Sequence, residues 1–97
     1  MRFEIFLSRE AVEDFRHLDA YTRAQTKDAM ERHLRYEPMK TSRTRIKRLR
    51  GIHRPQFRLR VGDNLRVFYD VIGNKVEVLS IMTKEEALKW LKQTQGK

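Results

Sequence analysis

The stretch "FRLRVGDNLRVFYDVIGNKVEVLSI", residues 57–81, decides the fold because apolar and polar side chains alternate along it and two turn signals interrupt it. Such alternation predicts strands that bury one face. The dipeptide Gly73-Asn74 lies between two β-rich runs and predicts a two-residue hairpin turn. A second turn is expected at 62–64, so three neighbouring antiparallel strands are predicted.

The length of the turn at 62–64 determines which side chains share a face of the sheet. A two-residue turn would place Arg60 opposite Leu65 and would mix charged with apolar side chains on one face. A three-residue turn pairs Val61 with Leu65 and separates the two kinds of side chain. We therefore predict the three-residue turn, with Asn64 in the left-handed conformation at its third position.

This register divides the sheet into an apolar and a basic face. The apolar face is predicted to carry Phe57, Leu59, Val61, Leu65, Val67, Tyr69 and Val71. The other face carries Arg58, Arg60 and Arg66, with Arg60 directly opposite Arg66. Like charges on paired strands destabilise a hairpin by a few tenths of a kcal/mol up to about 1 kcal/mol, so their grouping favours a role in binding anions.

The N-terminal half of the chain predicts one strand and two helices. Residues 2–7, "RFEIFL", alternate as a strand does, and Ser8 is expected to cap the helix that follows. A second helix is predicted over 20–36, with a capping box formed by Thr22 and Gln25. The inner faces are predicted to carry Ala11, Phe15 and Leu18 in the first helix and Ala29, Met30, His33 and Leu34 in the second.

The remaining segments complete the predicted order of elements. Residues 45–51, "RIKRLRG", indicate a short charged strand, and 83–93 indicate a final helix that begins with a Thr83/Glu86 capping box. Regular pairing in the second hairpin would place Phe68 opposite Leu79, with the final helix above Phe68, Leu79 and Ile81. We therefore predict a single α+β domain over 1–97, ordered β-α-α-β-β-β-β-α, with an antiparallel-rich sheet, a helical hairpin on one face and a C-terminal helix.

The distribution of charge indicates the kind of partner. The chain has 22 Lys and Arg, 13 Asp and Glu, and a formal net charge of +9. Residues 40–66 hold ten of the basic residues and one acid, Asp63, so the rest of the chain is electrically balanced. A field this concentrated attracts polyanions, and nucleic acid is favoured over a membrane because the basic segment is predicted to be strand rather than amphipathic helix.

Composition also excludes several classes of chemistry. The chain lacks cysteine, which excludes disulfides, a thiol nucleophile and Cys-based zinc sites. Its three histidines, His17, His33 and His53, do not have metal-ligand spacing, so no metal and no cofactor are predicted. The N-terminal hydrophobic run is too short for a signal peptide or a membrane span, and we expect a soluble cytoplasmic protein without a small-molecule substrate.

The segments "RLRG" (48–51), "FRLRVGD-LRVFYDV" and "KVEVLSI" together resemble the RelE/ParE superfamily, the toxin halves of bacterial toxin–antitoxin pairs. The resemblance covers nearly the whole chain. For a RelE-like toxin it implies cleavage of messenger RNA in the ribosomal A site without metal, and inhibition by a cognate antitoxin. The motif does not separate this activity from ParE-like inhibition of gyrase, or from a degenerate toxin that only binds.

The resemblance also implies a set of site residues. The basic strand positions of the family correspond to Arg58, Arg60 and Arg66, while a later arginine falls on Lys84 and a tyrosine on Trp90. Lysine keeps the charge but loses the bidentate geometry of arginine, and tryptophan has no phenol to exchange a proton. We assign catalysis to Arg66, Lys84 and Arg60, with Arg66 as the clamp on the phosphoryl group. The residues expected to bind RNA are Arg58, Arg54, Arg48, Lys47 and Trp90.

Each assignment has a structural alternative. The three strand arginines can form a solvated sheet face, which we weigh below phosphate binding because the whole net charge of the chain lies around them. Lys84 can be simply the first residue after a helix cap. Trp90 can pack on the last helix rather than stack on a base.

Overall fold

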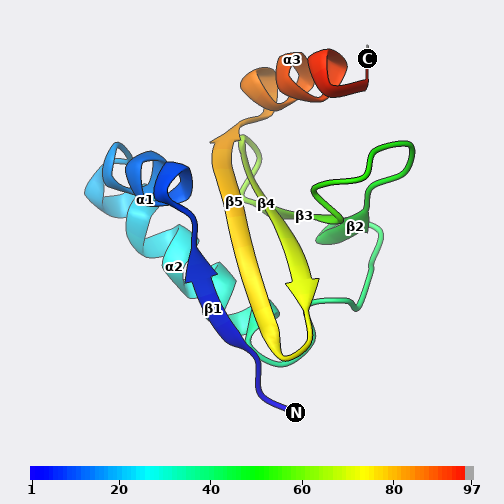
Figure 1. Ribbon diagram of the computed structural model, residues 1–97. Coiled ribbons are helices and arrows are strands. Elements are labelled where there is room, and N and C mark those ends of the chain that lie inside the picture. Colours follow the sequence, from blue (N-terminus) through cyan, green and yellow to red (C-terminus); the bar gives the residue numbers. More distant parts are fainter. Residues whose placement is uncertain (96–97) are drawn as a thin grey trace.

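The elements of the described chain follow the predicted order (Figure 1). The computed structural model describes residues 1–95. The elements are β1 (Glu4–Leu7), α1 (Arg9–Arg16), α2 (Ala20–Leu34), β2 (Ile46–Arg48), β3 (Phe57–Val61), β4 (Leu65–Ile72), β5 (Lys75–Thr83) and α3 (Lys84–Gln95). The α+β class is confirmed.

The strands form one five-stranded sheet in the order β1-β5-β4-β3-β2. Strands β2 to β5 pair antiparallel with their sequence neighbours, because short turns join β3 to β4 and β4 to β5. Strand β1 pairs parallel with β5, since α1, α2 and the intervening strands separate the two in sequence. The sheet is therefore mixed but rich in antiparallel pairs, as predicted.

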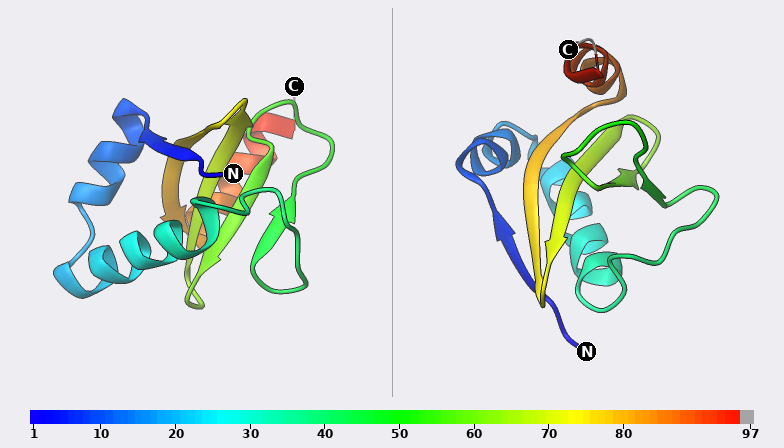
Figure 2. Two further views of the ribbon diagram at one scale, coloured as in Figure 1. Left: turned by 90° about the horizontal axis from the view of Figure 1, so that it is seen from below. Right: turned by 45° about the vertical axis from the view of Figure 1, so that its right-hand side comes forward.

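Helices α1 and α2 cover the apolar face of the sheet (Figure 2). Side chains from both helices and from all five strands contribute to this core. Leu59, Val67 and Tyr69 are fully buried in it, which confirms the predicted apolar face. Tyr69 stacks on Phe57 with ring centroids 5.5 Å apart, and its hydroxyl donates to the carbonyl oxygen of Pro38. Burial raises the pKa of Tyr69, so the phenol stays neutral inside the core.

The helix caps agree with the sequence in two cases and differ in one. The Ser8 hydroxyl accepts from the Ala11 amide at 3.1 Å and caps α1 as predicted. The predicted Thr22 cap of α2 is wrong: Asp19 is the N-cap, and its Oδ1 accepts from the Thr22 amide at 2.8 Å. A carboxylate one residue before the first helical residue satisfies a free amide of the first turn, which leaves Thr22 inside the helix.

Helix α2 also ends earlier than predicted, and it buries Met30 and Leu34 of the predicted stripe together with Thr26. It ends at Leu34 rather than at 36, and its buried residues are Thr26, Met30 and Leu34, whereas His33 is partly exposed. The Thr26 hydroxyl donates to the Thr22 carbonyl at 2.7 Å. This bond inside the helix lets a polar residue occupy a core position that hydrophobicity alone does not predict.

The turn between β3 and β4 has the predicted length and a different conformation. Val61 pairs with Leu65 and Arg60 with Arg66, as predicted. The left-handed residue is Gly62, with φ 62°, and not Asn64, because all non-glycine residues of the described chain avoid positive φ. Glycine has no Cβ and adopts this conformation at the lowest cost, so the strained position moves to the start of the turn.

The pairing of β4 with β5 contains a bulge that corrects the predicted register. Tyr69 pairs with Val78, as expected, but Phe68 pairs with Ser80 rather than with Leu79. The inserted residue shifts the alternation, so Ile81 joins the core under α1 and α2 instead of lying under α3. Helix α1 binds the freed backbone groups: the Ser8 hydroxyl donates to the Leu79 carbonyl, and Asp14 Oδ2 accepts from the Ile81 amide, both at 2.9 Å.

Helix α3 begins with the predicted capping box and lies at one end of the sheet. The Thr83 amide donates to Glu86 Oε1 at 2.9 Å, and the Glu86 amide donates to the Thr83 hydroxyl at 3.1 Å. Ala87 is buried, while Leu88 is 62% exposed. Across residues 1–95, no helix is long and apolar enough to span a bilayer.

Candidate functional site

Two rows of side chains cross the sheet on the face opposite α1 and α2. The first row runs from β2 to β5 and consists of Lys47, Arg58, Phe68 and Ser80. The second row, on β3, β4 and β5, consists of Arg60, Arg66 and Met82. The register therefore confirms that the three strand arginines share one face, which we call the arginine face.

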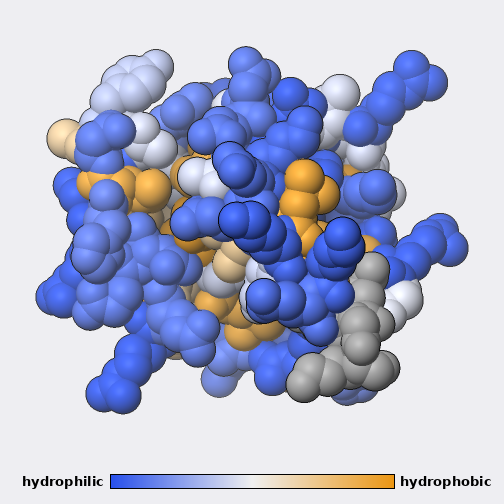
Figure 3. Space-filling model, turned by 90° about the horizontal axis from the view of Figure 1, so that it is seen from above, coloured by the Kyte–Doolittle hydropathy of each residue, from blue (hydrophilic) through white to orange (hydrophobic). Residues whose placement is uncertain are grey.

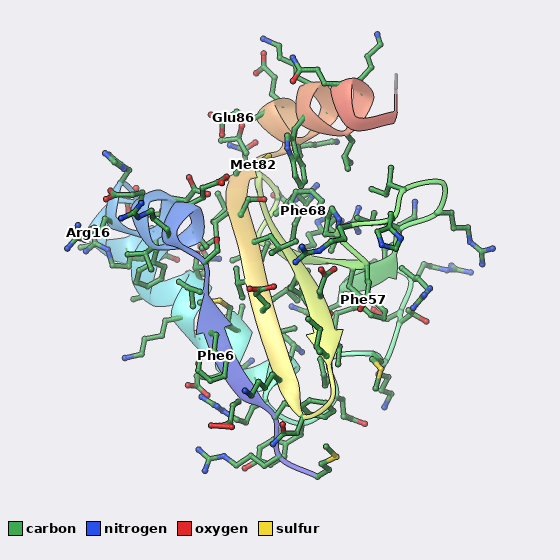
Figure 4. The ribbon with its side chains drawn as sticks, in the orientation of Figure 1. Phe6, Arg16, Phe57, Phe68, Met82 and Glu86 are labelled. Carbon is green, nitrogen blue, oxygen red and sulfur yellow. The ribbon has the colours of Figure 1, made fainter. Side chains whose placement is uncertain are left out.

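Helix α3 covers part of the arginine face, and a hollow of about 110 Å³ lies between them. Phe68 and Met82 lie at the end of the sheet nearest to the helix (Figure 4). The hollow is lined by Arg58, Arg66, Phe68, Lys84, Ala87, Leu88 and Leu91. It thus joins three basic side chains with an aromatic and aliphatic wall, and brings two of the predicted catalytic residues together with Arg58.

Arg66 is buried without an acidic partner. Its side chain is held by Nη1, which donates to the carbonyl oxygens of Leu65 at 3.0 Å and Asp63 at 3.3 Å. No carboxylate among residues 1–95 forms an ion pair with it. Burial and the charge of Arg60 lower the pKa of Arg66, although Asp63 opposes them. An anion that enters the hollow would stabilise this buried guanidinium, because it would supply the missing negative charge.

Within residues 1–95, Arg58 also lacks an acidic partner, and in addition one of its nitrogen atoms has no hydrogen-bond acceptor. Burial, followed by the charges of Arg66 and Arg60, lowers its pKa. Its Nε and the Ser80 hydroxyl oxygen are the buried side-chain polar atoms without a hydrogen-bond partner in the described chain. Phe68 separates the two residues in the same cross-strand row. An unpartnered buried donor costs about 1–3 kcal/mol, and an anion bound over Arg58 removes that cost.

The other two predicted catalytic residues, Lys84 and Arg60, differ in their position relative to the hollow. The Lys84 amide donates to the Asn64 carbonyl at 2.7 Å, which ties the start of α3 to the turn between β3 and β4. The Lys84 side chain lines the hollow, although the residue is exposed. Arg60 lies outside the hollow: Nη2 pairs with Asp63 at 3.1 Å, and Nε donates to the Gly62 carbonyl at the same distance. Of the predicted catalytic residues, Arg60 is therefore the one whose charge is already partly neutralised.

The predicted RNA-binding residues are distributed over different parts of the surface. Lys47 is exposed on the arginine face opposite Arg58. Arg48 pairs with Phe57 and lies over its ring at 5.2 Å from the centroid, on the side of the sheet that faces α2. Trp90 packs edge-on against Phe68, with centroids 5.1 Å apart.

Arg54 has acidic partners on the arginine face. Its Nε donates to Asp70 Oδ2 at 2.6 Å, and its Nη2 donates to Glu77 Oε1 at 2.9 Å. Asp70 is buried and also accepts from the Gln56 amide at 2.7 Å. The hydrogen bond with Asp70 is the main cause that raises the pKa of Arg54. The charge of Arg54 thus anchors the segment before β3.

Sequence reasoning did not include several residues that shape the site. Phe68 forms the floor and Ala87 and Leu91 the wall of the hollow, whereas the sequence indicates these three only as packing residues. The end of the molecule where α3 lies has a largely hydrophilic surface with small, separated apolar patches (Figure 3). Within residues 1–95, no group of three or more histidines and carboxylates is placed to hold a metal ion.

Comparison with protein families matches most of the chain to a family of toxins. A family model described as the ParE toxin of the type II toxin–antitoxin system, parDE, matches residues 5–88. No curated protein matches.

Solved structures share the fold at low sequence identity. The archaeal RelE-RelB complex from Pyrococcus horikoshii gives a TM-score of 0.69 at 21% identity and covers 87% of this chain and 97% of that chain. The RelB-RelE antitoxin–toxin complex from Methanococcus jannaschii gives 0.65 at 20% identity and covers 88% and 96%. The YoeB dimer from Staphylococcus aureus gives 0.65 at 17% identity and covers 84% and 97%.

Proposed function

The chain belongs to the ParE toxin family of type II toxin–antitoxin systems, and we propose that it is a RelE-like toxin that cleaves messenger RNA in the ribosomal A site. The observation that carries this proposal is the hollow in which Arg58, Arg66 and Lys84 meet without a carboxylate from the described chain. Cations that lack acidic partners suit a substrate that brings negative charge, and RNA brings a phosphate at every nucleotide.

The proposed chemistry uses these cations to stabilise charge on the phosphate. The ribose 2′-oxygen forms a bond to the adjacent phosphorus and gives its proton to a water molecule of the solvent, while the bond from phosphorus to the 5′-oxygen breaks. Arg66 binds the phosphoryl oxygens as their charge grows, and Arg58 holds the same phosphate in line. Donors fixed in advance contribute strongly, because the loss of one of them costs about 3–4 kcal/mol in comparable sites.

Lys84 is placed to act on the leaving group. Its side chain lines the same hollow as Arg66, and the hydrogen bond from its amide to Asn64 fixes the start of α3 beside that arginine. In the proposal its ammonium group donates a proton to the departing 5′-oxygen. A lysine performs this role as a point charge with rotatable donors, whereas bidentate recognition of the phosphate falls to the arginines.

The proposed partners follow from the relatives. The solved structures from Methanococcus jannaschii and Pyrococcus horikoshii are complexes of RelE with RelB, and we propose an antitoxin that likewise inhibits this chain. Messenger RNA on the ribosome is the proposed target, which places the activity in the cytoplasm. The net charge of +9 favours association with an acidic antitoxin.

A ParE-like inhibitor of gyrase is the second candidate function. Trp90 favours it, because that position corresponds to a tyrosine in RelE-like toxins and here packs edge-on against Phe68. A tryptophan has no phenolic proton to transfer. A degenerate toxin that retains binding alone is the third candidate.

Induction in bacteria, with mapping of RNA 5′ ends and measurement of the DNA damage response, distinguishes the candidates. New ends inside translated messages that disappear with Arg66→Ala support the RelE-like function. DNA damage signalling with intact messages, together with gyrase inhibition by the purified protein, supports the ParE-like function. If growth continues unchanged with the wild-type protein, the RelE-like and the ParE-like functions are both contradicted. The third candidate, a degenerate toxin that only binds, then remains. Arg16→Ala serves as the control, since Arg16 is an exposed arginine on α1.

A further inference from the structure

The row of arginines on β3 and β4 continues beyond the hollow under α3. The Arg60 amide donates to the Arg45 carbonyl at 2.9 Å, and Arg60 pairs with Arg66. Arg45, Arg60 and Arg66 therefore occupy successive positions across three neighbouring segments of chain. Neighbouring strands lie about 4.8 Å apart, so the row extends the positive surface by about 10 Å from Arg66 to Arg45.

Two further hollows meet at Arg45. One, of about 320 Å³, lies between Arg45, Arg60 and the turn that contains Asp63. The other, of about 250 Å³, lies between the end of α2 and the segment before β2. The polar side chains that line this second hollow are Arg32, His33, Glu37, Lys40, Thr41, Ser42 and Arg45. Arg45 lines both hollows, so its side chain links the second hollow to the row that leads to Arg66.

The charges around the second hollow leave it positive. Glu37 pairs with Lys40 at 3.6 Å and Asp28 with Arg32 at 3.3 Å, so each of these acids is matched by a base. Arg45 forms no ion pair with any residue of the described chain. Burial lowers the pKa of His33, and the charges of Arg45 and Arg32 lower it further, against the opposing charge of Asp28.

Ser42 adds a hydrogen-bond donor to the positive charge. Its hydroxyl oxygen accepts from the Arg45 amide at 2.9 Å and from the Ile46 amide at 3.4 Å. These two bonds use the lone pairs of the oxygen and leave its hydrogen to donate. A site with a guanidinium, an ammonium and a hydroxyl donor matches the oxygens of a phosphate group.

We propose that the hollow around Arg45, Ser42 and Lys40 binds a backbone phosphate of the same RNA strand whose reacting phosphate lies at Arg66. The inference rests on the proposed function for the position of the reacting phosphate. RNA fits better than an acidic peptide, because phosphates recur at short, regular intervals along one strand and the arginines recur at the strand spacing of the sheet. The second hollow then fixes the direction in which RNA leaves the site.

Binding of a labelled oligouridylate tests the inference without any need for cleavage. The RNA carries 2′-O-methyl groups so that it stays intact, and its affinity for the purified full chain is measured by fluorescence anisotropy. The variant Lys40→Gln/Arg45→Gln is expected to bind about tenfold more weakly, with a salt dependence of log Kd shallower by about 1, the change expected for one lost phosphate contact. Arg45→Lys, which keeps the charge, is expected to retain most of the affinity.

The matched control is Arg9→Gln/Arg16→Gln, which removes the same net charge from exposed positions on α1. Equal weakening by both double variants would overturn the proposal, since it would reduce the effect to net charge. Polyglutamate that binds as tightly as the RNA, and loses as much affinity in the Lys40/Arg45 variant, would overturn it in favour of an acidic protein partner. If the inference holds while the wild-type protein cuts no message in cells, the nuclease proposal fails and the binding site stands.

Discussion

The two ends of the arginine face differ in whether their basic side chains have acidic partners. At one end, which we call the paired end, Arg54 binds Asp70 and Glu77, and these two acids lie opposite each other on β4 and β5. At the other, the unpaired end, Arg58, Arg66 and Lys84 surround a hollow without a carboxylate of the described chain. Met82 stands opposite Arg66 where an acid would complete the pair. The same strands thus neutralise charge where it anchors a loop and leave it unneutralised where a phosphate is proposed to bind.

Removal of Arg66 tests the unpaired end with the largest expected effect. Arg66→Ala is expected to lower cleavage of messages by about 100-fold or more, because the clamp on the phosphoryl oxygens is lost. The free energy of unfolding is expected to change by less than about 1 kcal/mol, since relief of a buried charge offsets two lost hydrogen bonds. Mapped RNA ends and urea denaturation measure the two quantities. Undiminished cleavage would refute the role of Arg66.

Removal of Asp70 tests the paired end and reverses this pattern. Asp70→Ala leaves the Gln56 amide without its acceptor and leaves Arg54 with Glu77 alone, so we expect a loss of about 2 kcal/mol in unfolding free energy. Affinity for RNA should stay within about twofold. Asp28→Ala is the control, because Asp28 pairs with Arg32 on the surface and its loss should cost less than about 1 kcal/mol. Equal destabilisation by both variants would show that Asp70 has no special role.

A carboxylate introduced at the unpaired end should make it resemble the paired one. Met82→Glu places an acid opposite Arg66 and is expected to weaken RNA binding about tenfold by competition for the guanidinium. Met82→Gln has nearly the same shape without the charge and should change the affinity by less than about twofold. Anisotropy titrations of both variants provide the comparison. If Gln weakens binding as much as Glu, shape and not charge controls the site.

The pH dependence of RNA binding gives the smallest expected effect. Burial, Arg45 and Arg32 lower the pKa of His33, against the opposing charge of Asp28, while Glu37 and Lys40 line the same hollow. A phosphate bound there favours the protonated form, so the affinity for oligouridylate should rise as the pH falls. We expect about a threefold gain between pH 7.5 and 5.5, absent in His33→Gln. The same gain in that variant would assign the effect to another group.

The contrast between the two ends could be predicted only in part from the sequence. Alternation and the turn at 62–64 place Arg58, Arg60 and Arg66 on one face, because the period of a strand is local information. The sequence places Arg54 in the loop before these strands and predicts that it binds RNA, with no sign of its acidic partners. Its acids lie 16 and 23 residues away, and only the closed loop before β3 brings them together.

The bulge in β5 likewise depends on contacts between residues that are distant in sequence, so local patterns do not predict it. Regular pairing places Ile81 beneath α3, whereas the actual register buries it under α1 and α2. The groups that accommodate the bulge are Ser8 and Asp14, 71 and 67 residues from their partners. By contrast, the Asp19 cap is local: its signal stands in the sequence one residue before α2, although the pair Thr22 and Gln25 also has the spacing of a capping box.

The most direct test compares the salt dependence of RNA binding for Arg66→Gln and Arg54→Gln. Each variant removes one positive charge from the same face of the sheet. We predict that Arg66→Gln lowers the slope of log Kd against log salt concentration by about 1 and leaves stability nearly unchanged, while Arg54→Gln leaves the slope unchanged and lowers stability. Equal slopes for the two variants, or a larger change for Arg54→Gln, would contradict the division of this face into a paired end that holds the fold and an unpaired end that binds RNA.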